Sequence, residues 1–263
     1  MHDTCARSRT RRFEQGVRPT LTDVTLVAVT SVAIRPTIDA LKRCLIEASF
    51  GEVLLLCDQE PPDGVGPEIN WRRIGRLESR ADYSRFMLRE LADFVTTSHA
   101  LCVQWDGFVL NGAAWDPHFL DFDYIGAVWP QFDDGHNVGN GGFSLRSRRL
   151  LEVCKELPFQ GFESEDVVIG RTYRSRLEDC GIRFAPESVA RRFAYERTQP
   201  TGREFGFHGA FNMVEHVSPK DALRIFRSLE PGMLARNERL ELFRWALKRG
   251  RVRLAASLLK RLI

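Results

Sequence analysis

A carboxylate stands where a predicted buried strand ends. In "VQWDGF" (103–108), Asp106 follows an apolar run and precedes a turn at Gly107. A hard divalent cation prefers oxygen ligands and retains waters, so one or two carboxylates hold it when a diphosphate supplies the remaining oxygens. The alternative is structural, because an aspartate beside a glycine also caps a turn. The segment alone allows both interpretations.

Two later segments combine glycines and acids in ways that could serve chemistry. The adjacent glycines of "VGNGGF" (138–143) let backbone amides approach a ligand closely, or they form a simple turn. In "ESED" (163–166), Asp166 or Glu165 could act as a general base that deprotonates a hydroxyl. Acids are also favourable at the start of a helix, which explains this segment without a function.

A histidine flanked by glycine and aromatic residues forms the fourth segment. His208 in "FGFHGAFN" (205–212) is either a metal ligand or phosphate contact, or a structural histidine.

The elements that position these residues alternate between strands and helices. Apolar runs predict strands over 25–34, 51–58, 70–77 and 101–103, and helical periodicity predicts helices over 36–48 and 82–95. This alternation indicates βαβ units and a mostly parallel sheet. Ligands bind beyond the carboxyl ends of such strands, where Asp58 and Asp106 both stand.

The second half of the chain is less regular. It predicts helices over 146–157 and 164–181, a short strand over 182–186, and two helices around Gly250. We expect three parts: a disordered basic segment over 1–20, one α/β domain over 21–217, and a basic helical appendage over 218–263.

Charge and cysteine usage exclude several classes of protein. Residues 1–20 carry a net charge of +3 and residues 218–263 carry +8, which leaves −8 between them. An acidic body of this kind argues against nucleic-acid binding. The six cysteines are scattered without a CxxC pair, which favours a reducing compartment over a disulfide framework or a zinc site. With no signal peptide or apolar span, a cytoplasmic location is expected.

In this order and spacing, the four segments resemble the GT-A class of nucleotide-sugar glycosyltransferases over residues 21–215. More narrowly, "VQWDGFVLN", "FLDFDYIGAVW", "VGNGGFSLRSRRLL" and "SEDV" resemble a bacterial and fungal glycosyltransferase-like family catalogued as a domain of unknown function. The resemblance implies a GT-A-like (Rossmann-like) α/β fold, with a mostly parallel central sheet flanked by helices and a C-terminal helical appendage.

The resemblance also implies a metal site. GT-A enzymes end the strand beneath the nucleotide in a D-x-D-type motif, whose last acid holds the Mn²⁺ or Mg²⁺ that bridges the diphosphate. Asp106 occupies that position here, whereas Gln104 replaces the first acid of the motif. A late histidine often completes the coordination, which makes His208 the second expected metal ligand.

Further residues are implied in donor binding and catalysis. The glycine segment of such enzymes lies beside the donor sugar, a place taken here by Asn140, Gly141 and Gly142. In inverting members the acid that opens the later helix is the catalytic base, which corresponds to Asp166, with Glu165 as the alternative.

Nucleotide contacts come from the first strand end and nearby loops. The expected nucleotide-sugar-binding residues there are Thr30, Asp58 and Tyr83, in addition to Gln104 and Asp106.

The expected activity is sugar transfer from a nucleotide-sugar donor to a glycan or lipid-linked acceptor, metal-assisted and inverting, in bacterial surface glycan synthesis. One alternative is a sugar-phosphate nucleotidyltransferase, for which "TSVAIRP" (30–36) offers only Arg35 as a phosphate-gripping cation. Another alternative is a non-catalytic subunit that binds a nucleotide or sugar, which is compatible with Gln104.

The basic tail has two interpretations of its own. Its twelve Lys and Arg residues beside leucine stripes could dock on an anionic inner membrane. An ordinary helical hairpin with a solvated basic face, or a contact for a partner or second subunit, is slightly favoured.

Overall fold

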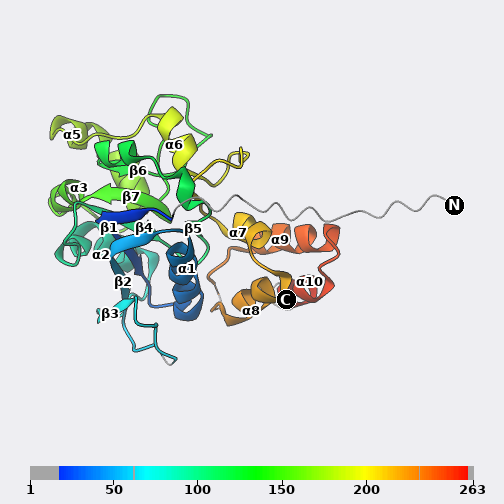
Figure 1. The fold of residues 1–263 in the computed structure, drawn as a ribbon. Coiled ribbons are helices and arrows are strands. Elements are labelled where there is room, and N and C mark those ends of the chain that lie inside the picture. The colour runs from blue at the N-terminus through cyan, green and yellow to red at the C-terminus, as the bar shows by residue number, and fades with distance from the viewer. Residues whose placement is uncertain (1–17, 62, 231, 260–263) are drawn as a thin grey trace.

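The chain folds around a six-stranded sheet. The structure is a computed structural model that describes residues 18–61, 63–230 and 232–259. The strands lie in the order β3-β2-β1-β4-β7-β6 (Figure 1). Their bounds are β1 Thr20–Val29, β2 Ser49–Cys57, β3 Asn70–Arg73, β4 His99–Val103, β6 Tyr124–Ile125 and β7 Phe143–Ser147. The first four strands are parallel, and β7 is antiparallel to both β4 and β6. The predicted α/β fold with a mostly parallel central sheet is confirmed.

Helices cover both faces of this sheet. Leu26 and Ala28 of β1 belong to the hydrophobic cluster that includes α1 (Ile34–Glu47), whereas Val27 and Val29 belong to the cluster of α2 (Arg80–Arg89) and α3 (Arg148–Cys154). Figure 1 shows α1 on one side of the sheet and α2 with α3 on the other. A sheet buried on both faces explains why its strands read as continuous apolar runs.

A second, three-stranded sheet begins after the turn at the end of β4. It consists of β5 (Phe108–Val109), β9 (Gly206–Phe207) and β8 (Ala194–Tyr195), with β9 in the middle. β9 is antiparallel to β5 and parallel to β8. Because β5 comes directly after the turn at Gly107, this small sheet brings residues near 196 and 208 to the end of β4.

Four helices follow β9, and the last three of them lie within residues 218–263, where a helical appendage was expected. They are α7 (Ala210–His216), α8 (Pro219–Ser228), α9 (Arg236–Lys248) and α10 (Val252–Leu259). Figure 1 shows α8, α9 and α10 grouped on the α1 side of the sheet. Their buried residues, among them Phe226 and Leu242, continue the main hydrophobic cluster. The two helices expected around Gly250 are present as α9 and α10, and Gly250 adopts a left-handed conformation (φ 65°) between them.

The single helix predicted over 164–181 is wrong, because the structure has three short helical segments there. They are α4 (Glu165–Val167), a π-helical turn (Val168–Thr172) and α5 (Arg174–Asp179). Gly170 lies in the π-helical turn against the ring of Trp129, and a Cβ at Gly170 would lie 3.1 Å from that ring. π-turns of this kind are frequent at functional sites.

Other predicted elements differ mainly in length. The helix expected over 146–157 is only α3, since Arg146 and Ser147 still belong to β7. The strand expected over 182–186 is reduced to one bridge between Tyr124 and Phe184. The remaining helix of the α/β body is α6 (Glu187–Phe193).

The segment over 1–20 was expected to be disordered. Its residues 1–17 lie outside the described residues, and β1 begins at Thr20. Four of the five described cysteines are buried free thiols, and Cys180 is exposed. Within the described ranges, every helix is too short or too polar to cross a membrane.

Candidate active site at the carboxyl edge of the sheet

The end of β4 turns sharply at the edge where β1 and β2 also end. The Gln104 amide donates to the Gly142 carbonyl (2.9 Å), and the Gly107 amide donates back to the Gln104 carbonyl (3.1 Å). This turn holds Asp106, which is 8% exposed. An aspartate buried at a strand end is costly unless it has polar partners.

His208 is the main partner of Asp106. Pairing of Phe207 with Phe108 across β9 and β5 places the next residue, His208, beside the turn. Its Nε2 lies 3.3 Å from Asp106 Oδ1 and 3.3 Å from Gln104 Oε1. The ring reaches this position because residue 142 is glycine, since a Cβ there would lie 2.0 Å from Nε2. The structure therefore brings Gln104, Asp106, Gly142 and His208 together.

A second carboxylate, Glu196, was missed by the sequence reasoning. The parallel pairing of Tyr195 with Phe207 puts Glu196 next to His208, and Glu196 Oε1 lies 3.5 Å from His208 Nδ1. Asn212 donates from Nδ2 to the backbone carbonyls of Glu196 (2.8 Å) and His208 (2.7 Å), which fixes the two residues relative to each other. The available signal was an acid directly after an aromatic residue, Glu196 after Tyr195, as Asp106 follows Trp105.

The two carboxylates stabilise a charged imidazole in this largely buried place. Burial opposes the charge, but the proximity of Asp106 and Glu196 raises the pKa of His208 to about 10. Burial alone would raise the pKa of Glu196. The hydrogen bond and the positive charge of His208, together with a hydrogen bond from Asn140, lower this pKa below its usual value.

Asp106 and His208 also have the chemistry of cation ligands. Asp106 Oδ1 is buried and accepts no hydrogen bond from the described residues. Adjacent ligands of an octahedral ion, each about 2.1 Å from it, lie about 3 Å apart, which is close to the spacing of this pair. Among the described residues, no group of three or more His, Cys, Asp and Glu side chains could hold a metal ion. With its imidazole neutral, His208 has the chemistry to ligate a divalent cation together with Asp106, and the other ligands would then come from a diphosphate and water.

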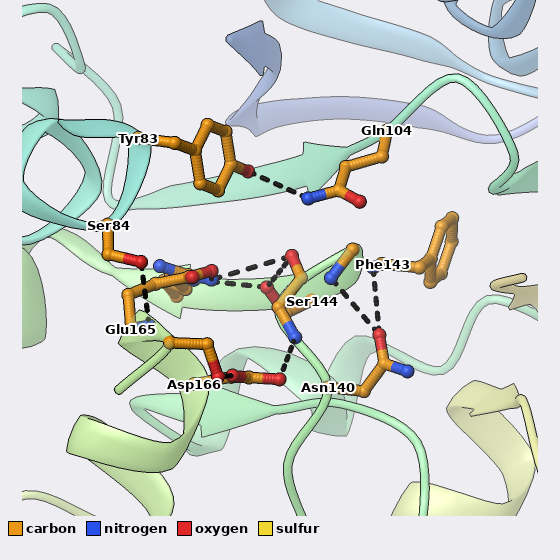
Figure 2. A network of polar contacts seen from close by, with 12 residues as sticks. Tyr83, Ser84, Gln104, Asn140, Phe143, Ser144, Glu165 and Asp166 are labelled. Atoms are coloured by element: carbon orange, nitrogen blue, oxygen red, sulfur yellow. Dashed lines mark hydrogen bonds and ion pairs between the residues drawn. The ribbon is translucent and has the colours of Figure 1, made fainter. Parts of the chain in front are cut away.

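The glycine-rich loop connects this cluster to the predicted general base. Asn140 adopts a left-handed conformation (φ 71°) and accepts from the Gly142 amide at Oδ1 (3.1 Å), with its Nδ2 lying 3.2 Å from His208 Nδ1. The Gly141 amide donates to Asp166 Oδ2 (3.1 Å). Figure 2 shows Asn140 and Asp166 on either side of this loop. Asp166 is half-buried at the start of α4 and also accepts from Ser164 and from the Val167 amide.

Glu165, the alternative base, has a structural role in the protein interior. Its Oε1 accepts from Arg146 Nη2 (2.9 Å), and the two side chains are 5% and 0% exposed. Burial and the neighbouring Asp166 raise the pKa of Glu165, which Arg146 opposes. A Cβ at Gly141 would lie 2.1 Å from Glu165 Oε1, so this glycine has a packing reason of its own. Of the two acids, Asp166 is partly exposed, whereas Glu165 is buried against Arg146.

The remaining predicted residues lie around the same edge. Tyr83 accepts a hydrogen bond at Oη from Gln104 Nε2 (3.1 Å), as Figure 2 shows. Thr30 follows β1, where its backbone amide donates to Leu56 (2.9 Å). Asp58 follows β2, with one buried oxygen that accepts no hydrogen bond from the described residues and with Arg76 4.0 Å from the other. Thr30 and Asp58 lie at the same edge of the sheet as His208. Their described partners are Leu56 and Arg76, and not His208 or Asp106.

The fold and the site define an α/β protein with an open, mostly parallel sheet. Proteins of this class bind ligands at the carboxyl ends of the strands, where the polar side chains gather here. More particularly, the chain belongs to the family described as "Protein of unknown function (DUF5672)", which matches residues 69–208. The matched span includes Gln104, Asp106, Asp166 and His208, so the predicted resemblance to a family of unknown function is confirmed. No curated protein matches the chain.

Solved structures with a similar fold include three described as glycosyltransferases. A glycosyltransferase involved in the glycosylation of the major capsid of PBCV-1 is 14% identical, with 73% of this chain and 98% of that chain covered and a TM-score of 0.48. The galactosyltransferase LgtC, in complex with donor and acceptor sugar analogs, is 11% identical, with 70% and 86% covered and a TM-score of 0.42. Apo-form GlyE of Streptococcus pneumoniae TIGR4 is 13% identical, with 71% and 54% covered and a TM-score of 0.41. All three similarities are distant.

Proposed function

We propose that this chain is a glycosyltransferase of the hexosyltransferase type, which moves a sugar from a nucleotide-sugar donor to an acceptor hydroxyl. The observation that carries the proposal is the loop from Asn140 to Gly142. On one side this loop contacts His208, the partner of Asp106, and on the other side its Gly141 amide holds Asp166. The proposed cation ligands, Asp106 and His208, and the proposed proton acceptor, Asp166, therefore lie next to one short loop.

The chemistry assigns a different role to each side of the loop. Asp106 and His208 would hold Mn²⁺ or Mg²⁺, which when bound stabilises the negative charge growing on the departing diphosphate. Asp166 takes the proton of the acceptor hydroxyl while the hydroxyl oxygen forms a bond to the anomeric carbon of the donor sugar. The bond from that carbon to the diphosphate oxygen breaks, and its electron pair leaves with the nucleoside diphosphate. Because the attack comes from the opposite face, the anomeric configuration is inverted.

The nucleotide is assigned to the edge formed by β1, β2 and α2. Thr30 and Asp58 follow the parallel strands β1 and β2, and Tyr83 lies on α2, where it fixes Gln104. The unsatisfied buried oxygen of Asp58 is suited to accept a hydrogen bond from a nucleotide hydroxyl. The space beside the Cα atoms of Gly141 and Gly142 is taken by Glu165 and His208, so in this proposal the donor sugar lies next to the loop and not in the room left by these glycines.

The acceptor is proposed to be a bacterial surface glycan or its lipid-linked precursor. Exposed Leu247 and Val252 lie among basic residues of α9 and α10, a combination that suits peripheral contact with an anionic membrane surface.

Replacement of Asp166 by asparagine separates catalysis from binding. We expect Asp166→Asn to lower the turnover of the nucleotide-sugar by about 10²- to 10⁴-fold, because the acceptor hydroxyl loses its general base. Nucleotide affinity should be unchanged, since the amide keeps an oxygen for the Gly141 amide. Turnover is measured as release of the nucleoside diphosphate from UDP-, GDP- and dTDP-sugars, and as release of CMP from CMP-sugars.

The exposed Asp133 offers the matched control, and Asp133→Asn should behave as the wild type. Full turnover in Asp166→Asn would remove this residue from the proposed mechanism. Product formation only from a nucleoside triphosphate and a sugar phosphate would instead identify a nucleotidyltransferase.

A further inference from the structure

Helix α2 contacts both halves of the candidate site through two neighbouring residues. Tyr83 accepts a hydrogen bond from Gln104 Nε2 (3.1 Å), on the side of the proposed cation ligands. Ser84 Oγ accepts from the backbone amide of Glu165 (3.2 Å), on the side of the proposed base. Figure 2 shows both hydrogen bonds, one toward the end of β4 and the other toward the start of α4. One helix therefore fixes a point on each side of the site.

The start of α4 has no cap bond from its own N-cap side chain. Ser164 stands at the N-cap position, but its hydroxyl donates to Asp166 and accepts from none of the helix amides. The first amides of a helix have no partner within the helix, and the amide of Glu165 has Ser84 as its partner. Because Ser84 is only 2% exposed, this bond lies in the protein interior, where an amide without a partner is costly.

Glu165 is held at its backbone as well as at its side chain. The amide donates to Ser84, and the carboxylate accepts from Arg146 (2.9 Å). The next residue, Asp166, therefore extends from a fixed backbone, and its Oδ2 accepts from the Gly141 amide (3.1 Å). Without the bond to Ser84, only side-chain contacts would hold this segment against the rest of the site.

Helix α2 is itself firmly attached to the sheet. The amide of Leu77, just before the helix, donates to Ser31 Oγ (2.9 Å), and Ser31 follows β1. Phe86 and Met87 are each 2% exposed and pack in the hydrophobic cluster that α2 shares with β1. A hydrogen bond to Ser84 therefore fixes the start of α4 relative to the central sheet.

We propose that Ser84 is a positioning residue for Asp166, which fixes the start of α4 and so sets where the base meets the acceptor hydroxyl. This inference rests on the proposed function, because Asp166 is the general base only in that proposal. Ser84 itself acts through the Glu165 amide and touches neither donor nor acceptor. A displacement of about 1 Å at a reacting group can lower the rate on the order of 100-fold.

Ser84→Ala should separate the two kinetic constants. We expect kcat to fall about 10- to 100-fold with the donor KM unchanged, because the turn that holds Gln104 and Asp106 keeps its contacts. Tyr83→Phe, one residue earlier on the same helix, should raise the donor KM roughly 2- to 10-fold, since it removes the hydrogen bond that fixes Gln104. Both constants are measured from product release with the same UDP-, GDP-, dTDP- and CMP-sugars as for Asp166→Asn.

Ser147→Ala supplies the matched control. Ser147 is also buried, and its Oγ accepts from the Leu150 amide at the start of α3 (3.0 Å). It pairs with His99, at the opposite edge of the sheet from the site, so this variant should lose stability and keep the wild-type kcat. Thermal unfolding shows whether each variant folds. If Ser84→Ala does not, Ser84→Cys keeps a similar shape with a weak acceptor and should also lower kcat.

The possible contradictions differ in what else they remove. If the folded Ser84 variant keeps the wild-type kcat, if it changes only KM, or if Ser147→Ala loses as much kcat, the role of Ser84 is wrong and the proposed function stands. If the wild type releases product from none of the nucleotide-sugars, the proposed function fails and the inference fails with it.

Discussion

Arg146→Ala should destabilise the protein by about 3–5 kcal/mol, a large part of the 5–15 kcal/mol that holds a typical domain folded. Arg146 is wholly buried and donates to Glu165, Ser144 and the Gly141 carbonyl. Its removal leaves the Glu165 carboxylate in the protein interior with no opposite charge. Buried pairs contribute little net stability as pairs, but a single remaining partner is very unfavourable.

The destabilisation should depend on pH in a defined direction. The pKa of Glu165 is already raised in the folded protein, and loss of Arg146 raises it further. A group whose pKa is raised by folding favours the folded state below its unfolded pKa, near 4.3, and that contribution is lost as pH rises through the folded pKa. The deficit of Arg146→Ala relative to wild type should therefore be smaller under mildly acidic conditions than above neutral pH.

Urea unfolding of both proteins at several pH values measures this deficit. The double variant Arg146→Ala with Glu165→Gln serves as the control, because it removes the titrating group and should flatten the pH dependence. A deficit below about 1 kcal/mol, in the range of a surface ion pair, or one that grows toward acid pH, would be incompatible with the buried pair described here.

Gly142→Ala should disable the candidate cation site. The new Cβ would lie 2.0 Å from His208 Nε2, a distance that forces the ring away from Asp106. Overpacking of this kind costs typically 1–3 kcal/mol, and the displaced ring no longer faces a cation beside Asp106. We expect a lower melting temperature together with loss of any Mn²⁺-dependent nucleotide binding.

Gly75→Ala is the matched control for this substitution. Nothing lies within 4 Å of a Cβ at Gly75, and its backbone is outside the left-handed region. Its binding and stability should stay close to those of the wild type. Undiminished Mn²⁺-dependent binding in Gly142→Ala would mean that His208 is not needed in its present position.

The residues at strand ends could be predicted because two simple regularities coincide there. A strand buried on both faces produces an apolar run, and the first polar residue after it lies at the ligand-binding edge. Gln104 is the first polar residue after β4 and Asp106 follows two residues later, and the small sheet brings His208 to both.

Glu196 and Arg146 escaped prediction for different physical reasons. The strand before Glu196 has only two residues, too few for a periodic signal. Arg146 lies near the end of β7, "FSLRS" (143–147), whereas the sequence pattern placed it at the start of a helix over 146–157; arginine is rarely buried. Only the tertiary position of Glu165, which provides the opposite charge, explains an arginine in that strand.

The glycine pair shows how one motif can have two explanations. Gly141 makes room for Glu165 and Gly142 makes room for His208, which are packing requirements. The backbone amide of Gly141 has a separate role, because it donates a hydrogen bond to Asp166. The motif was therefore correctly located from the sequence, whereas its packing partners depend on contacts between distant parts of the chain.

The central claim, that Asp106 and His208 form a cation–diphosphate site, is tested most directly by thermal unfolding with UDP, GDP, CMP and dTDP, each with and without Mn²⁺, on wild type and Asp106→Ala. A nucleotide at about 100 times its dissociation constant stabilises the folded state by roughly 2.7 kcal/mol, a readily measured shift. The account predicts that one nucleotide stabilises the wild type only when Mn²⁺ is present, and that Asp106→Ala loses this effect. If no nucleotide shifts the wild type, or if Asp106→Ala responds equally, Asp106 is a turn residue and the proposed site is wrong.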